Sequence, residues 1–109
     1  MNIRLVIRPE AERDIQEAYL WYEKRREGLG EDFLLCVEEG LSKIMRSPHM
    51  YPVVYRGVRR LLVRRFPYGI FYVIREELIS VLAVLHGHRD PDRWRQRATH
   101  EVRGDPKTT

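Results

Sequence analysis

The sequence is poor in cysteine and contains no long apolar run. Cys36 is the single cysteine among 109 residues, which excludes a disulfide within the chain and an all-cysteine metal site. The longest apolar stretch, residues 78–85, is interrupted by Ser80 and is too short to cross a bilayer as a helix. Residues 1–11 also lack the apolar centre of a signal peptide, so we expect a cytoplasmic protein.

The chain does contain enough apolar material for one folded domain. Hydrophobic residues make up 43% of the sequence and charged residues 33%, a balance that supports a packed core and excludes a disordered chain. A length of 109 residues suits one domain. We expect this domain to span residues 1–97 and to be followed by a polar tail at residues 98–109.

Positive charge is concentrated in the second half of the chain. Residues 1–50 hold eight lysines and arginines against ten acidic residues, whereas residues 51–109 hold twelve against six. A basic C-terminal half predicts a surface for an anionic partner, such as a nucleic acid, the ribosome or an acidic protein segment. A solvated, arginine-rich surface without a partner is the alternative.

Periodicity predicts a strand followed by a helical hairpin. Apolar and polar residues alternate over residues 2–8, which is typical of a strand, and Pro9 suits the first turn of a helix. Apolar side chains then recur at helical spacing to about residue 27. Gly28 and the glycine two residues later end this helix, and a second helix closes before Pro48.

The period changes near residue 54, after an expected loop. Three runs of β-branched and aromatic residues, 58–66, 69–74 and 79–86, predict an antiparallel meander. Residues 91–97 predict a short C-terminal helix. The predicted fold class is therefore α+β, with the N-terminal strand, both long helices on one face of the sheet, the meander and the short helix.

Five arginines lie between residues 56 and 65, where no acidic residue occurs. In an extended chain Arg60 and Arg64 share one face, opposite Leu61 and Val63. Guanidinium groups about 6–7 Å apart along a strand match successive phosphates or carboxylates. The pattern favours an anion-binding face, and an edge strand that charge protects from aggregation is the alternative.

Two histidines, His86 and His88, stand at the expected end of the last strand. A catalytic zinc site needs a third protein ligand, and His49 and His100 fall in a loop and a tail, so we predict no metal and no cofactor. His88 beside Arg89 offers a proton donor or acceptor next to a cation that can hold a phosphate. A strand-end histidine bonded to the backbone is the alternative, above all for His86.

Aromatic residues lie close to these basic residues in the expected fold. Tyr68 and Trp94 are candidates for stacking on bases, because every base has a π-face. Tyr72 is assigned to the core.

Several segments together resemble the RelE/ParE superfamily of toxins from type II toxin-antitoxin systems. They are Pro9-Glu10-Ala11-Glu12-Arg13-Asp14-Ile15 with Tyr22, residues 44–48, residues 59–65, Phe66-Pro67-Tyr68-Gly69-Ile70-Phe71-Tyr72, and Val84-Leu85-His86 before Asp90-Pro91. The resemblance covers residues 3–97, and the order and spacing of the segments carry it. It implies a toxin that a labile antitoxin holds inactive, with Arg60, Arg64 and Arg89 facing carboxylates of that antitoxin.

The superfamily implies two modes of poisoning. RelE-like members cleave messenger RNA on the ribosome, and that activity would make His88, Arg89 and Arg64 catalytic. ParE-like members inhibit DNA gyrase. The residues expected to bind the target or a nucleic acid are Arg60, Arg64, Arg65, Tyr68, Arg89 and Trp94.

One departure favours gyrase inhibition over messenger RNA cleavage. Gly69 stands where a RelE-like nuclease is expected to carry an arginine, and losing such a cation commonly costs orders of magnitude in rate. The ending Val84-Leu85-His86 before Asp90-Pro91 also looks more ParE-like. Two alternatives stay open: a ribosome-dependent endonuclease with His88 as general acid, and a non-toxic domain that binds its antitoxin as a partner or co-repressor. In each case we expect a toxin-antitoxin hetero-oligomer.

Overall fold

The described part of the chain comprises residues 3–87 and 91–103 of a computed structural model. Strand β1 (Arg4–Ile7) is followed by helices α1 (Pro9–Arg25) and α2 (Leu29–Arg46). Strands β2 (Val53–Tyr55), β3 (Val58–Leu62), β4 (Tyr68–Arg75) and β5 (Leu78–His86) come next, and helix α3 (Pro91–Arg103) ends the described chain.

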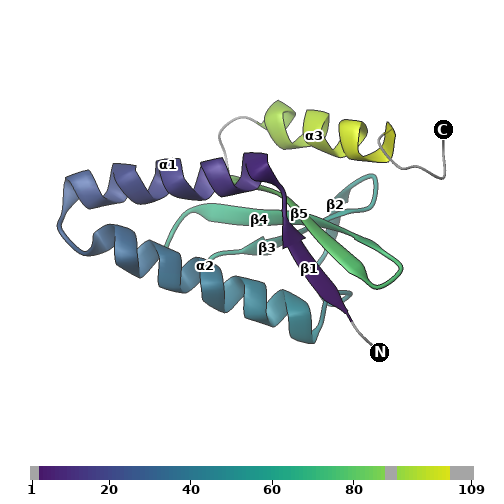
Figure 1. The fold of residues 1–109 in the computed structure, drawn as a ribbon, viewed down its shortest axis with the longest axis horizontal. Coiled ribbons are helices and arrows are strands. Elements are labelled where there is room, and N and C mark those ends of the chain that lie inside the picture. Colours follow the sequence, from purple (N-terminus) through teal and green to yellow (C-terminus); the bar gives the residue numbers. More distant parts are fainter. Residues whose placement is uncertain (1–2, 88–90, 104–109) are drawn as a thin grey trace.

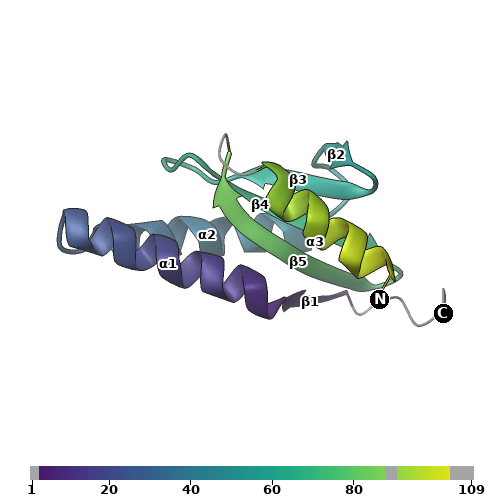
Figure 2. The same cartoon turned by 90° about the horizontal axis from the view of Figure 1, so that it is seen from above.

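The strands form one mixed sheet in the order β1-β5-β4-β3-β2. β2 to β5 make an antiparallel meander, and β1 joins the sheet parallel to β5. Helices α1 and α2 lie on one side of the sheet and α3 on the other, as Figures 1 and 2 show. The predicted α+β class, helical hairpin and antiparallel meander are confirmed.

Three predicted boundaries are wrong. The expected loop before residue 54 contains β2, which pairs with β3 across a tight turn whose residues Arg56 and Gly57 both have positive φ. β3 ends at Leu62 instead of residue 66, because the chain bends and Arg65 adopts a left-handed φ of 73°. Helix α3 continues to Arg103, so residues 98–103 belong to the helix and not to a polar tail.

The larger core lies between the helical hairpin and the sheet. Phe33 and Ile44 from α2 meet Ile70, Tyr72 and other sheet residues there, all with essentially no exposed surface. Gly40 lets α2 approach the sheet, since a Cβ there would come within 2.9 Å of side-chain atoms of Ile70 and Leu61.

The turn of the hairpin is held by a carboxylate of α1. Glu23 accepts hydrogen bonds of 2.9 Å from the backbone N–H groups of Gly28 and Gly30, at the start of α2. These N–H groups have no partner within the helix, and a negative charge is favourable at a helix N-terminus. Gly30 is required by the close approach, because a Cβ would lie 2.7 Å from the Tyr19 carbonyl oxygen.

A second, smaller core lies under α3. Trp94 stacks on Phe71 with ring centroids 4.5 Å apart and planes 17° from parallel, and Ala98 packs beside them. Trp94 is only 7% exposed. The Trp94 ring thus anchors α3 to the sheet, and its expected stacking on a base stays a prediction.

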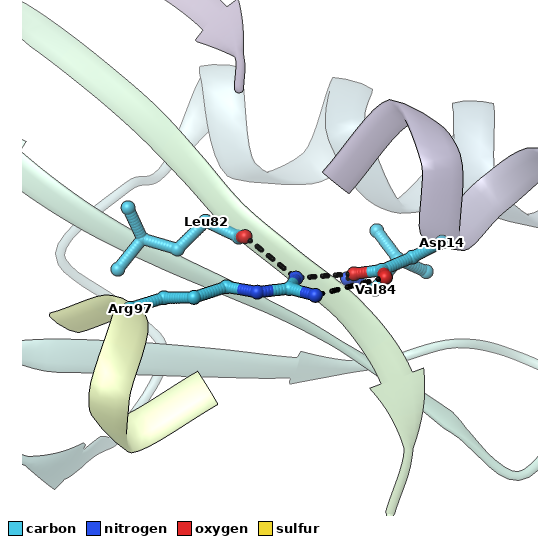
Figure 3. A network of polar contacts seen from close by, with 4 residues as sticks. All are labelled: Asp14, Leu82, Val84 and Arg97. Carbon is cyan, nitrogen blue, oxygen red and sulfur yellow. Dashed lines mark hydrogen bonds and ion pairs between the residues drawn. The ribbon is translucent and has the colours of Figure 1, made fainter. Parts of the chain in front are cut away.

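An ion pair closes the outer edge of β5 where β1 ends. β1 pairs with β5 only as far as Val81, and Leu82 is an extra residue relative to β4. Beyond that point Asp14 of α1 accepts a hydrogen bond of 3.0 Å from the Val84 N–H. Arg97 of α3 donates to both Asp14 oxygens, at 2.6 and 3.2 Å, and to the Leu82 carbonyl at 3.1 Å, as Figure 3 shows.

The Asp14–Arg97 pair predicts a large loss of stability when one partner is removed. The Asp14 side chain is 3% exposed, so Arg97→Met leaves a buried carboxylate without its cation. We expect the free energy of unfolding to fall by about 3–5 kcal/mol in chemical denaturation. The double variant Asp14→Leu/Arg97→Met should lose less than Arg97→Met alone, because no unpaired charge remains. An equal or larger loss in the double variant contradicts this account.

Tyr72 makes the stability depend on pH in the alkaline range. Its hydroxyl donates a hydrogen bond of 2.7 Å to the Pro48 carbonyl, and burial raises the pKa of Tyr72 from 10.0 to about 12. The folded state thus favours the neutral phenol, so this contribution is complete below pH 10 and is lost as the pH rises through 12.

The prediction compares the wild type with Tyr72→Phe. Wild-type unfolding free energy should fall by roughly 2–3 kcal/mol more than that of the variant between about pH 10 and 12. Urea denaturation at a series of pH values measures the difference. Parallel curves for the two proteins would show that Tyr72 ionises as freely in the folded state as in the unfolded state.

Candidate functional site

Arg60 lies on the face of the sheet that α3 covers. Arg60 of β3 is the strand partner of Phe71 of β4. The aliphatic part of the Arg60 side chain passes over Gly69. The Arg60 Nε is buried and has no hydrogen-bond partner. Gly69 therefore provides the space that the Arg60 side chain occupies. The glycine thus has a structural role, in addition to replacing the arginine that a RelE-like nuclease is expected to carry at this position.

Arg64 and Arg65 lie elsewhere, against α2. The Arg64 Nε donates a hydrogen bond of 2.9 Å to Glu39, and Arg65 lies 3.8 Å from a carboxylate oxygen of Asp32. The hydrogen bond with Arg64 lowers the pKa of Glu39, and the same contact raises the pKa of Arg64. The expectation that Arg60 and Arg64 share one face is wrong, because β3 ends before residue 64 and alternation ends with it.

Tyr68 belongs mainly to the larger core. Its ring packs edge-on against Tyr22 and Phe33, with centroids 6.0 and 5.1 Å away, and His86 lies 5.7 Å from it on the other strand. Tyr68 and His86 also line a cavity of about 410 Å³ between α1, β5 and the start of α3. Tyr68 is thus half-buried at the edge of the core and not on the Arg60 face.

Two further predicted site residues, His88 and Arg89, lie outside the described residues. Within residues 3–87 and 91–99, no three histidine, cysteine, aspartate or glutamate side chains are grouped so that they could hold a metal ion. Of the predicted site residues, the structure describes Arg60, Arg64, Arg65, Tyr68 and Trp94, and it divides them between two sides of the sheet. Arg60 and Trp94 lie on the α3 face, whereas Arg64 and Arg65 contact α2 and Tyr68 belongs to the larger core.

A basic groove at the edge of β3 was missed in the sequence. This α2–β3 groove has a volume of about 730 Å³ and runs between the end of α2 and β3. Its lining residues are Lys43, Arg46, Ser47, Met50, Tyr51, Pro52, Arg60, Leu61 and Leu62. Met50 and Leu62 are 68% and 64% exposed, so apolar surface and positive charge occur together. Lys43 and Arg46 are one helical turn apart, which is the signal in the sequence that could have placed them on one face.

The fold and the comparisons with known proteins define the class. Residues 5–91 match the family described as "ParE toxin of type II toxin-antitoxin system, parDE". The chain belongs to this family of toxins, which confirms the resemblance seen in the sequence and the type II toxin function expected from it.

Particular relatives agree with this assignment. The chain is 27% identical over 93 residues to proteins named Toxin ParE2 from two Mycobacterium tuberculosis strains, CDC 1551 / Oshkosh and H37Rv. Each match covers 84% of this chain and 89% of the relative. The fold is similar to a solved chain described as "Chromosomal ParDE TA system from P. aeruginosa", with a TM-score of 0.60 and 19% identity over 77% of this chain and 95% of that one.

No helix among the described residues is both long and apolar enough to span a bilayer.

The packing of Arg60 over Gly69 predicts an energetic coupling between the two residues. A Cβ at position 69 would lie 3.1 Å from the Arg60 Cγ and 3.2 Å from its Cδ, so Gly69→Ala requires the Arg60 stem to shift by a few tenths of an ångström. In an Arg60→Ala background the same substitution should cost less, because the stem is gone. Denaturant unfolding of the four proteins measures this coupling. An identical cost in both backgrounds contradicts the proposed contact.

Proposed function

We propose that this toxin arrests growth by inhibiting DNA gyrase and that it acts by binding, without cleaving RNA. The observation that carries the proposal is that Arg64, the described residue of the expected catalytic set, is bonded to Glu39 and lies away from Arg60, its expected neighbour on the strand. Arg60 lies on the α3 face of the sheet, whereas Arg64 is bonded to Glu39 on α2, on the other side.

Catalysis at a phosphate depends on charges that converge on the atoms where charge develops. Cleavage of RNA also needs a proton donor and acceptor within hydrogen-bond reach of the reacting oxygens. Arg60 and Arg64 are directed to different surfaces, and Gly69 is covered by the Arg60 stem. This arrangement favours a protein that recognises its target through surfaces.

Membership of the family implies an antitoxin as partner. We propose that an extended antitoxin segment with apolar and acidic side chains occupies the α2–β3 groove. Its apolar side chains would contact Met50 and Leu62, and its carboxylates would approach Lys43, Arg46 and Arg60. β2 pairs with β3 only as far as Arg60, so the backbone beside Leu62 can accept a further strand.

The other expected antitoxin contacts, Arg64 and Arg89, differ in what the structure offers. Arg64 already has a carboxylate partner in Glu39, so an antitoxin carboxylate would have to compete for it. Arg89 lies outside the described residues and stays a proposed contact.

The gyrase proposal predicts that His88→Gln keeps its toxicity. Loss of a general acid or base commonly costs a nuclease about 10²–10⁴ in rate, whereas a surface that only binds should lose less than about tenfold in potency. The measurements are growth arrest on expression, inhibition of plasmid supercoiling by purified gyrase, and primer extension on translated messages. His49→Gln, an exposed histidine before β2, is the matched control.

Each outcome has a defined meaning. Gyrase inhibition by both the wild type and His88→Gln, with uncut messages, supports the proposal. Cuts at codon positions that disappear in His88→Gln would assign the toxin to the ribosome-dependent nucleases. Normal growth together with uninhibited gyrase would contradict the proposal and favour a non-toxic domain that only binds its antitoxin.

A further inference from the structure

Two arginines flank one tyrosine ring on the α3 side of the sheet. The guanidinium carbons of Arg56, in the β2–β3 turn, and Arg95, on α3, each lie 5.4 Å from the centroid of the Tyr55 ring. Arg95 is also 5.4 Å from the Trp94 ring, and Tyr55 meets Trp94 edge-on at 5.9 Å. Residues from β2, its turn and α3 thus form one surface, although about forty positions separate them in the sequence.

Arg60 extends this surface along β3. It is paired with Phe71, the residue on which Trp94 stacks, so its stem lies beside the same row of rings. Its buried Nε has no hydrogen-bond acceptor. Tyr55, Arg56, Arg60 and Arg95 are hereafter called the Tyr55 cluster.

Among the described residues, the arginines of the cluster have no carboxylate partner, unlike Arg64, Arg65 and Arg97. Arg64, Arg65 and Arg97 each lie within 4 Å of an acidic side chain. Across the described part of the chain, no such ion pair involves Arg56, Arg60 or Arg95. Three like charges are therefore held around the rings without local neutralisation, which favours the binding of an external anion.

We propose that the Tyr55 cluster binds the phosphate backbone of DNA. Guanidinium groups that stack on a ring keep their N–H edges free, stay charged at every relevant pH and match phosphate geometry. Arg56 and Arg95 share one ring, so the distance between them is at most twice 5.4 Å, and neighbouring phosphates of one strand can reach both. The use of this contact rests on the proposed gyrase inhibition, since DNA is the substrate of gyrase.

The chemistry of the cluster favours DNA over an acidic protein segment. A protein segment needs apolar anchors, which the α2–β3 groove supplies through Met50 and Leu62. Beside the Tyr55 cluster, the rings of Phe71 and Trp94 are only 1% and 7% exposed, so the guanidinium edges of the cluster are the groups that face a ligand. Such contacts position a nucleic acid without selecting its base sequence.

The test measures binding of a fluorescent short duplex DNA to the purified full chain by anisotropy over a range of salt concentrations. For three phosphate contacts, the plot of log K against log salt should have a slope of about −2.7. Arg56→Ala/Arg95→Ala should weaken binding at low salt and reduce the magnitude of that slope by about 2. Arg60→Met, which keeps an apolar stem over Gly69, should reduce it by about 1.

A matched control removes the same charge elsewhere. Arg13→Ala/Lys24→Ala takes two cations from exposed positions of α1 and should leave the slope nearly unchanged. An equal loss in this control would mean that only net charge matters and would overturn the proposal. Unchanged thermal unfolding of each variant, followed by circular dichroism, shows that a loss of binding is not a loss of fold.

Three further measurements, with RNA, with polyglutamate and with gyrase, distinguish the possible anionic ligands and test the DNA-binding and gyrase proposals separately. Tighter binding of RNA than of DNA with the same sequence would overturn the DNA assignment. Polyglutamate that displaces DNA at equal charge concentration would overturn it in favour of an acidic protein. Gyrase inhibition that persists in the Arg56→Ala/Arg95→Ala/Arg60→Met variant without DNA binding would refute the use of the cluster while leaving gyrase inhibition in place. DNA binding without gyrase inhibition would support the cluster and contradict the proposed target.

Discussion

The Asp14 carboxylate at the edge of β5 connects helices α1 and α3 to that strand. β1 covers β5 only to Val81, and the backbone beyond it needs partners because an open edge has unpaired N–H and C=O groups. Asp14 supplies one acceptor from α1, and Arg97 brings a donor from α3 to Leu82. This contact and the stacking of Trp94 on Phe71 together hold α3 on the sheet.

The geometry of the Tyr55 cluster depends in turn on the position of α3. Trp94 stacks on Phe71, and the next residue, Arg95, reaches the Tyr55 ring. Without α3 on this face, Arg95 would not meet a side chain of β2. The buried ion pair thus contributes through geometry more than through net stability, since desolvation offsets much of the attraction in such pairs.

Some arginines pair with a carboxylate of the chain and connect its elements, whereas the arginines of the Tyr55 cluster have no such partner in the described part of the chain and are proposed to bind a ligand. Arg97 closes the β5 edge, and Arg64 and Arg65 connect the end of β3 to α2. Arg56 and Arg95 of the Tyr55 cluster and Arg46 of the α2–β3 groove have no such carboxylate among the described residues. Arg60 belongs to both, at the strand that joins the two surfaces.

The sequence by itself determined the helical hairpin, the antiparallel meander, the toxin family and the core position of Tyr72, because periodicity and local order of motifs carry that information. Only the tertiary structure decided that Arg64 turns to Glu39, that Trp94 is buried and that Arg97 pairs with Asp14, 83 positions away. A left-handed residue at position 65 ended the alternation of β3, and no pattern in the sequence signalled it. Contacts between distant residues depend on how elements pack, so the pairing of charges could not be derived from spacing along the chain.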